Sequence, residues 1–240
     1  MRRMRYCSFA ALLCLFVAAG TLVPSSARAQ DATDPQALDK SLHDYSVRVV
    51  KTRVFQHESL NGIYLGRGAV LTAAHVVGRF HLLKELHVRI AGQELPAKIV
   101  KEGSVEKTDL TVLSIDEEQL PVRLRLRLNP VCREPLKVGQ EVVVVAALGT
   151  ARSRVISPLL VPASARLKFG TVISDVPIAM SGSGVFDANK RCLLGIISRR
   201  IPRLDARKPP SRAASKADEY AKYFVPAPTI AEFLPKEFRF

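Results

Sequence analysis

Short apolar or alternating runs, separated by polar turns, recur along this chain and predict strands as its main elements. Residues 122–128 alternate valine or leucine with arginine, so we expect a half-buried strand whose arginines face water. Residues 86–100 predict two strands around a short turn at residues 91–93. Further strands are expected over residues 142–148 and 166–169. Many short strands of this kind indicate a barrel or a sandwich.

Three side chains suited to nucleophilic catalysis stand where strands meet loops, in the order His75, Asp109, Ser181. The histidine ends an apolar run, the aspartate opens another, and the serine lies in a Gly/Ser-rich turn. A serine nucleophile needs a base to take its proton, and the base needs an acid to hold its tautomer and charge. Each residue also has an ordinary interpretation: a packed or surface histidine, an acid at a strand start, a serine in a flexible turn. Their order and placement favour a triad.

The local sequences resemble the chymotrypsin-like (trypsin-fold) serine peptidases, above all the bacterial branch that includes the periplasmic heat-shock proteases. Residues 72–77 match the "T-A-A-H-V-V" turn of that family, and residues 109–113 match its "D-L-A-V-L" strand with Thr111 as the one change. Ser181 stands in a form of the family's "G-x-S-G-[GS]" turn. The resemblance covers most of residues 46–234 and implies a serine endopeptidase that acts on proteins or peptides.

The resemblance also implies a role for each member of the triad. His75 would be the general base, Asp109 its orienting acid, and Ser181 the nucleophile that forms an acyl-enzyme. No metal or organic cofactor is needed for this chemistry, and we expect none. Ser183 is a rival nucleophile if the register of the turn slips by two residues.

The fold implied by the resemblance is all-β, with two six-stranded antiparallel β-barrels and a C-terminal helix. We expect the first barrel at about residues 45–118, the second at about 134–228 and the closing helix at about 229–234. The histidine and aspartate would then come from the first barrel and the serine from the second, across a cleft. No length remains for an appended peptide-binding (PDZ) module, so we expect a bare protease domain.

Two segments outside the barrels have compositions of their own. Residues 30–44 predict a polar segment with a short helix. Residues 201–216 are rich in Pro, Arg, Ser and Ala, which predicts a mobile loop.

The approach to Ser181 departs from the family pattern. The family often reads "D-A-P-I-N-P-G-x-S", whereas residues 175–181 read D-V-P-I-A-M-S, two residues shorter and with Ala179 in place of glycine. The N–H groups of Ala179 and Ser181 are expected to form the oxyanion hole, but a Cβ restricts the backbone conformations that aim the first of them. Loss of one such donor costs roughly 100- to 1000-fold in turnover.

Substrate-binding residues are expected on two segments near the nucleophile. Residues 193–198 resemble the family strand that runs beside bound substrate, which assigns Ser198 and the following Arg199 to substrate binding. Asp175 lies six residues before the serine, where an aspartate selects Lys or Arg side chains in trypsins. The same aspartate also fits the "D-x-P-I" approach strand of the bacterial branch, where it has no such part. Arg199 and Arg200 either favour acidic side chains or are simply solvated.

Residues 1–29 have the features of a cleavable export signal. Basic residues precede an apolar stretch at 7–23, and an A-x-A cleavage site ends at Ala29. A single anchoring helix is the alternative, but Pro24 would break it. No later apolar stretch approaches the roughly 20 residues of a membrane span. We therefore expect a mature chain, residues 30–240, in a bacterial periplasm or outside the cell.

Export would leave Cys132 and Cys192 as the two cysteines of the mature chain. An oxidising compartment invites a disulfide between them. Closing this loop would be worth about 4 kcal/mol on the chain-entropy model. Their spacing is unlike that of a zinc site. The sequence leaves a bridge and two free thiols equally open.

The chain is strongly basic, with a formal net charge of +14 that falls to about +10 without residues 1–29. Such a balance favours polyanions, whether acidic substrates, anionic lipid surfaces or nucleic acid, without identifying which. We expect either polyanion contact through this basic surface or an ordinary soluble surface, and no specific nucleic acid is predicted.

A second class of function stays open, namely a catalytically impaired trypsin-fold domain that binds a periplasmic protein or a polyanion. The missing glycine before Ser181 supports it, while the complete triad argues against it. An esterase without protease activity is a third interpretation, since it would share the nucleophile.

Overall fold

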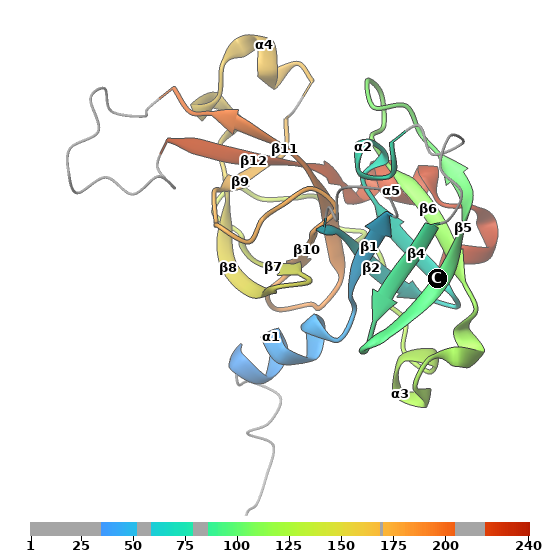
Figure 1. The fold of residues 1–240 in the computed structure, drawn as a ribbon. Helices are drawn as coiled ribbons and strands as arrows, with labels where there is room; N and C mark the ends of the chain where they lie inside the picture. Colours follow the sequence, from blue (N-terminus) through green and yellow to red (C-terminus); the bar gives the residue numbers. More distant parts are fainter. Residues whose placement is uncertain (1–34, 52–58, 79–85, 169, 205–218) are drawn as a thin grey trace, which may run out of the picture.

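The structure is a computed structural model that describes residues 35–51, 59–78, 86–168, 170–204 and 219–240. Within these ranges the strands close into two six-stranded antiparallel barrels that lie side by side (Figure 1). This arrangement confirms the predicted all-β fold.

The first barrel has the strand order β1, β2, β3, β6, β5, β4. Its strands are β1 Ser46–Lys51, β2 Ser59–Gly66, β3 Ala69–Thr72, β4 Leu86–Ile90, β5 Gln93–Glu102 and β6 Thr111–Ile115. The predicted hairpin over residues 86–100 is confirmed, with Ile90 paired to Gln93. Ala91 and Gly92 have φ values of 50° and 80°, the positive values that a two-residue hairpin turn requires.

The second barrel has the strand order β10, β11, β12, β9, β8, β7. Its strands are β7 Glu141–Ala146, β8 Gly149–Ile156, β9 Val172–Ser174, β10 Gly184–Asp187, β11 Leu193–Pro202 and β12 Tyr220–Pro226. Every residue of β7 after Glu141 is buried, which agrees with the apolar run from which a strand was predicted. The strand ends at Ala146, two residues before the run does.

The two barrels share apolar packing. Val143 and Phe186 of the second barrel belong to the same buried cluster as Ile63 of the first. Asn61 Oδ1 accepts the N–H of Ala147 at 2.9 Å, which adds a polar contact between the barrels. This junction fixes the orientation of one barrel against the other, so side chains from both can form one site.

Short helices cover the barrels. They are α1 Pro35–His43, α2 Ala74–Val77, α3 Val122–Arg125, α4 Ala163–Arg166 and α5 Ala227–Phe233, with single 3-10 turns at Glu117–Gln119, Pro158–Leu160 and Lys236–Phe238. Helix α1 lies against β7 and β8 (Figure 1). It falls within residues 30–44, for which the sequence predicts a short helix. Helix α5 begins two residues earlier than expected and buries Ile230 and Phe233. In the described ranges, no helix combines the length and the apolar character needed to cross a membrane.

The strand predicted over residues 122–128 is wrong, because this segment begins with the helical turn α3. The carbonyl of Pro121 accepts the N–H groups of Leu124 and Arg125 and so starts the turn. Each barrel closes through its own six strands, and none of these strands pairs with residues 122–128. The alternating pattern reflects one buried side chain, Leu124, on an otherwise exposed turn.

The strand predicted over residues 166–169 is likewise not formed where the structure describes it. Residues up to Arg166 belong to α4, which follows Pro162, and Leu167 is 93 % exposed. Most of the predicted mobile loop at residues 201–216 lies outside the described residues, although Ile201 and Pro202 end β11. The predicted export signal also lies outside them.

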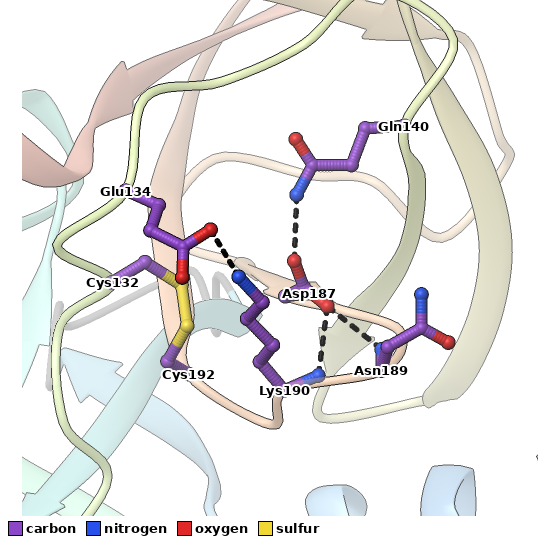
Figure 2. The surroundings of a disulfide bond; sticks show 7 residues. All are labelled: Cys132, Glu134, Gln140, Asp187, Asn189, Lys190 and Cys192. Atoms are coloured by element: carbon purple, nitrogen blue, oxygen red, sulfur yellow. Dashed lines mark hydrogen bonds and ion pairs between the residues drawn. A yellow bond between two sulfur atoms is a disulfide. The ribbon is translucent and has the colours of Figure 1, made fainter.

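A disulfide joins Cys132, in the segment between the barrels, to Cys192, just before β11 (Figure 2). Their Cα atoms are 5.0 Å apart. The backbone N–H of Cys132 also donates to Leu193 O at 2.9 Å. An ion pair between Lys190 and Glu134 lies beside the bridge. These contacts fasten the connecting segment to the second barrel.

Candidate active site

His75 is presented by the turn α2, which follows the end of β3. Val76 and Val77 are buried and anchor the turn on the first barrel, whereas the side chain of His75 is 35 % exposed. Gly78 ends the turn with a φ of 70°, a conformation that suits glycine. The imidazole is therefore accessible to solvent on a well-anchored support.

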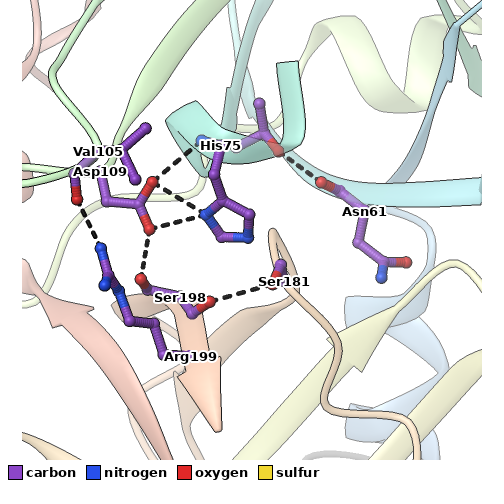
Figure 3. Close-up of polar contacts among 8 residues, drawn as sticks. Asn61, His75, Val105, Asp109, Ser181, Ser198 and Arg199 are labelled. Atoms are coloured by element: carbon purple, nitrogen blue, oxygen red, sulfur yellow. Dashed lines mark hydrogen bonds and ion pairs between the residues drawn. The ribbon is translucent and has the colours of Figure 1, made fainter. Parts of the chain in front are cut away.

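Asp109 lies just before β6 and is buried. Its φ is +47°, a left-handed conformation that aspartate adopts more readily than most residues. Its N–H donates to Ser104 O at 2.8 Å, which holds this backbone turn. Oδ1 accepts the backbone N–H of His75 at 3.0 Å, and ring Nδ1 lies 3.0 Å from Oδ1 and 2.9 Å from Oδ2 (Figure 3).

Two opposing effects act on the pKa of Asp109. Burial raises the pKa, but hydrogen bonds from the His75 ring, the Ser198 hydroxyl and the His75 backbone together outweigh burial and lower it below its usual range. The carboxylate is therefore ionised at neutral pH. With Nδ1–H donating to it, Nε2 of His75 is the acceptor nitrogen, the form that a general base needs.

Ser181 lies in the loop between β9 and β10. The next residue, Gly182, has a φ of 84°, and a Cβ there would stand 1.9 Å from Asn61 O. Glycine therefore lets the turn approach the first barrel this closely. The Ser181 hydroxyl donates to Ser198 O at 3.0 Å, and Figure 3 shows it below the His75 ring. Among the described residues, no hydrogen bond joins Ser181 to His75.

Ser183, the rival nucleophile, is fully buried. Its hydroxyl lies 3.5 Å from Ile178 O, and its N–H donates to Met180 O at 3.0 Å. A substrate carbonyl would have no access to it in this position, which favours Ser181.

Ser198 links the aspartate to the serine. Its hydroxyl donates to Asp109 Oδ2, and its carbonyl oxygen accepts the hydroxyl of Ser181 (Figure 3). The pairing of β11 with β12 shifts register between Ile197 and Arg199, at this residue. Sequence reasoning placed Ser198 beside substrate but missed its bond to Asp109, because no local pattern indicates a contact between residues 89 positions apart.

The expected oxyanion hole is incomplete in this structure. The N–H of Ala179 donates to Val176 O at 2.9 Å, and that of Met180 donates to Ile178 O at 2.8 Å. Ala179 is also fully buried. The expectation that its N–H faces the substrate oxygen does not hold in this conformation. The tight turns of segment 175–181 engage the N–H groups of Ala179 and Met180 instead of directing them to the cleft.

Asp175 opens the same loop, and both of its carboxylate oxygens are engaged. Arg200 Nε donates to Oδ2 at 3.0 Å, and Lys222 Nζ lies 3.5 Å from Oδ1. The guanidinium of Arg200 also stacks on the Tyr220 ring, 3.6 Å from its centroid. Two cations thus neutralise the Asp175 carboxylate. The structure therefore disfavours a role for Asp175 in selecting Lys or Arg side chains of a substrate.

Arg199 extends from β11 toward the first barrel, where its Nη2 donates to Val105 O at 2.6 Å (Figure 3). The structure therefore brings His75, Asp109, Ser181 and Ser198 together, with Arg199 at the edge of this group. Across the described ranges, His, Cys, Asp and Glu side chains form no group of three or more that could hold a metal ion.

Three solved protease structures share this fold over most of the chain. The Rv3671c protease of M. tuberculosis in its active form is 17% identical, with a TM-score of 0.57 and coverage of 82% of each chain. The serine endoprotease of Yersinia pestis is 18% identical, with a TM-score of 0.57, covering 86% of this chain and 66% of its own. The MamO protease domain of Magnetospirillum magneticum is 20% identical, with a TM-score of 0.53, covering 81% of this chain and 98% of its own.

These likenesses concern the fold, and the sequence itself shows the family. No curated protein matches the chain by sequence. A family model described as "Trypsin-like peptidase domain" matches residues 60–196, more than half of the chain, and this confirms the resemblance on which the predictions rest. The chain belongs to the trypsin-like peptidase family.

Proposed function

We propose that the chain is an exported serine endopeptidase in which His75, Asp109 and Ser181 act as the catalytic triad. The observation that carries the proposal is the pairing of His75 Nδ1 with the buried, ionised carboxylate of Asp109. A histidine held in this way has the correct tautomer for a general base, and the nucleophile loop meets the first barrel at the same place through Gly182.

In the proposed reaction, the hydroxyl of Ser181 turns from Ser198 O to Nε2 of His75. The imidazole takes the proton while Oγ attacks the peptide carbonyl carbon. The C–N bond then breaks, His75 gives the proton to the leaving amine, and the acyl group stays on Ser181. Water, deprotonated by the same histidine, then releases the acyl group as a carboxylic acid. Asp109 stays ionised and stabilises the imidazolium.

Oxyanion stabilisation is the part of the mechanism that needs a change of conformation. Ser181 N–H makes no hydrogen bond among the described residues, so it is a ready donor. The second donor, Ala179 N–H, has to leave Val176 O before it can face the developing charge. We infer that substrate binding or a partner drives this rearrangement.

Export to a periplasm or beyond is the compartment that we propose. The basic, apolar and A-x-A regions of residues 1–29 support it. A disulfide between Cys132 and Cys192 suits an oxidising environment.

Fluorophosphonate labelling tests the proposed nucleophile. We expect the purified protein and a Ser183→Ala control to be labelled, and Ser181→Ala to be unlabelled with nearly the same Tm. Cleavage of protein substrates beside simple esters then separates a peptidase from an esterase. Equal labelling of Ser181→Ala would refute this triad.

A catalytically impaired binding domain is the second candidate. The closed 175–181 segment favours it, because one oxyanion donor is engaged in that segment's own hydrogen bonds. This candidate predicts a folded protein without labelling or hydrolysis under any condition that preserves the fold, and retention of a periplasmic protein or a polyanion by wild type and Ser181→Ala alike.

A further inference from the structure

A cavity of about 260 Å³ lies against the candidate triad, and the proposed reaction does not use it. One wall is the segment before β6, residues 105–109, which ends at Asp109. The opposite wall is formed by Ser198 and Arg199 of β11, Tyr223 of β12, and Leu167 and Lys168 after α4. Both barrels therefore contribute to it.

The lining is rich in cations and hydrogen-bond donors. Lys107, Lys168 and Arg199 line the cavity, against two carboxylates. Of these, Asp109 is already bound by His75 and Ser198, so Glu106 is the acid that remains. A ligand with a negative end would meet three positive side chains here.

Apolar and neutral residues make up the rest of the lining, among them Leu167 and Tyr223. Leu167 is 93 % exposed at its rim, which offers an apolar surface to the stem of a side chain. Burial raises the pKa of the Tyr223 phenol, and the charge of Asp109 raises it further, so the hydroxyl stays protonated as a donor. The cavity thus combines an exposed apolar side chain with the exposed Lys107 and Lys168 and the half-buried Arg199.

The cavity is next to the place where a peptide would be cut. Ser198, in its wall, accepts the hydroxyl of Ser181 through its carbonyl oxygen at 3.0 Å. Strand β10 pairs with β11 only as far as Ile196. The next residue, Ile197, forms hydrogen bonds with Gly182 and Ser183 of the nucleophile turn. In the described part of the chain, no strand pairs with β11 after Ile197 on that side. An extended peptide could pair there and direct side chains into the cavity.

We propose that this cavity binds the carboxylate side chain of a glutamate or aspartate in the substrate. That residue lies within about three positions of the cleaved bond, since an extended peptide advances roughly 3.3 Å per residue. The inference rests on the proposed peptidase function and adds a substrate class to it. Three cations against the one remaining carboxylate, Glu106, favour an acidic over a basic side chain here. Asp175, which would otherwise attract a basic side chain, is paired with Arg200 and Lys222. The positive net charge of the chain acts in the same direction by drawing acidic segments to it.

Peptide pairs that differ only by Glu or Gln at one position test the proposal. The position is moved from three residues before to three residues after the cleaved bond. We expect kcat/KM to be about tenfold higher for Glu than for Gln at one position, a ratio that corresponds to one charge-assisted contact. In the double variant Lys107→Gln/Lys168→Gln, the ratio at that position should fall close to one.

The matched control is Lys98→Gln/Lys236→Gln, which removes the same charge from exposed lysines outside the cavity lining. It should keep the preference for Glu. A Glu/Gln ratio near one at every position, in a protein that cleaves the peptides, would overturn the acidic-site proposal and leave the peptidase function standing.

Fluorescence anisotropy with Ser181→Ala separates the two proposals when cleavage is absent. Tighter binding of the Glu peptide, lost in the Lys107/Lys168 double variant, would support the site even if the wild-type protein cut no peptide. Equal binding of both peptides would overturn the site.

Discussion

The two halves of the candidate active site are held together in different ways. In the histidine and aspartate half, the partners are far apart in sequence: His75 and Asp109 are 34 positions apart, and Asp109 and Ser198 are 89 apart. In the nucleophile loop, Ala179 and Met180 donate to carbonyls only two or three residues earlier. Long-range bonds depend on the packed fold, whereas local turn bonds exchange with little cost to it. The proposed general base, His75, is therefore fixed in advance, and the expected oxyanion site is the adjustable part.

The largest expected effect comes from breaking the fixed half. Asp109→Asn should lower kcat/KM about 10⁴-fold, because an amide does not hold the required tautomer of His75 or stabilise its charged form. Steady-state cleavage of a reporter peptide measures the change. Asp116→Asn makes the same chemical change at an exposed 3-10 cap and should leave activity unaltered. A loss below tenfold in Asp109→Asn would exclude Asp109 from the triad.

An intermediate effect should come from lengthening the adjustable half. Inserting Pro-Gly between Ala179 and Met180 should raise kcat about 100-fold, because the longer loop frees an N–H for the oxyanion. The same dipeptide inserted between Gly92 and Gln93, in the exposed hairpin turn, is the control and should change nothing. Thermal melts establish that each protein folds. A folded insertion variant without any gain would remove the loop length as the cause.

The smallest effect should come from removing the hydrogen bond between Ser198 and Asp109, which connects the two halves of the site. Ser198→Ala removes a donor to Asp109, which raises the pKa of that carboxyl toward its unfolded value, and it should lower kcat/KM about tenfold. Because the folded pKa is depressed, its stabilisation is present above the unfolded pKa, about 3.9, and is lost as pH falls through the folded value.

Urea unfolding at pH 5 and pH 3 measures the effect of the Ser198 hydroxyl on Asp109 separately from catalysis. The wild type should lose more of its free energy of unfolding over that interval than Ser198→Ala does. An identical loss in both proteins would show that the Ser198 hydroxyl has no part in holding Asp109.

Local patterns were sufficient for the residues that lie in short motifs. His75 follows an apolar run in a compact turn, and residues 86–100 carry a hairpin signal; both are where the sequence predicts them. The prediction of a strand over residues 122–128 failed because an alternating segment forms a strand only where a neighbouring strand pairs with it. Each barrel closes through its own six strands, and none pairs with this segment.

The remaining differences arise from tertiary contacts. That Asp175 is paired with Arg200 and Lys222 follows from the register of β11 with β12, which no window of sequence reveals. The hydroxyl of Ser198 reaches Asp109 only because the two barrels dock. The substitution at Ala179 was visible in the sequence, but the hydrogen bond that its N–H makes was not.

The close approach of Gly182 to Asn61 has a consequence for the newly synthesised chain. The nucleophile turn rests directly on the backbone of the other barrel, with no room for even a methyl group between them. The histidine and the serine are thus brought into position only when both barrels have formed and docked. Under the proposed function, a half-folded copy has no assembled triad and so does not digest unfolded neighbours during biosynthesis.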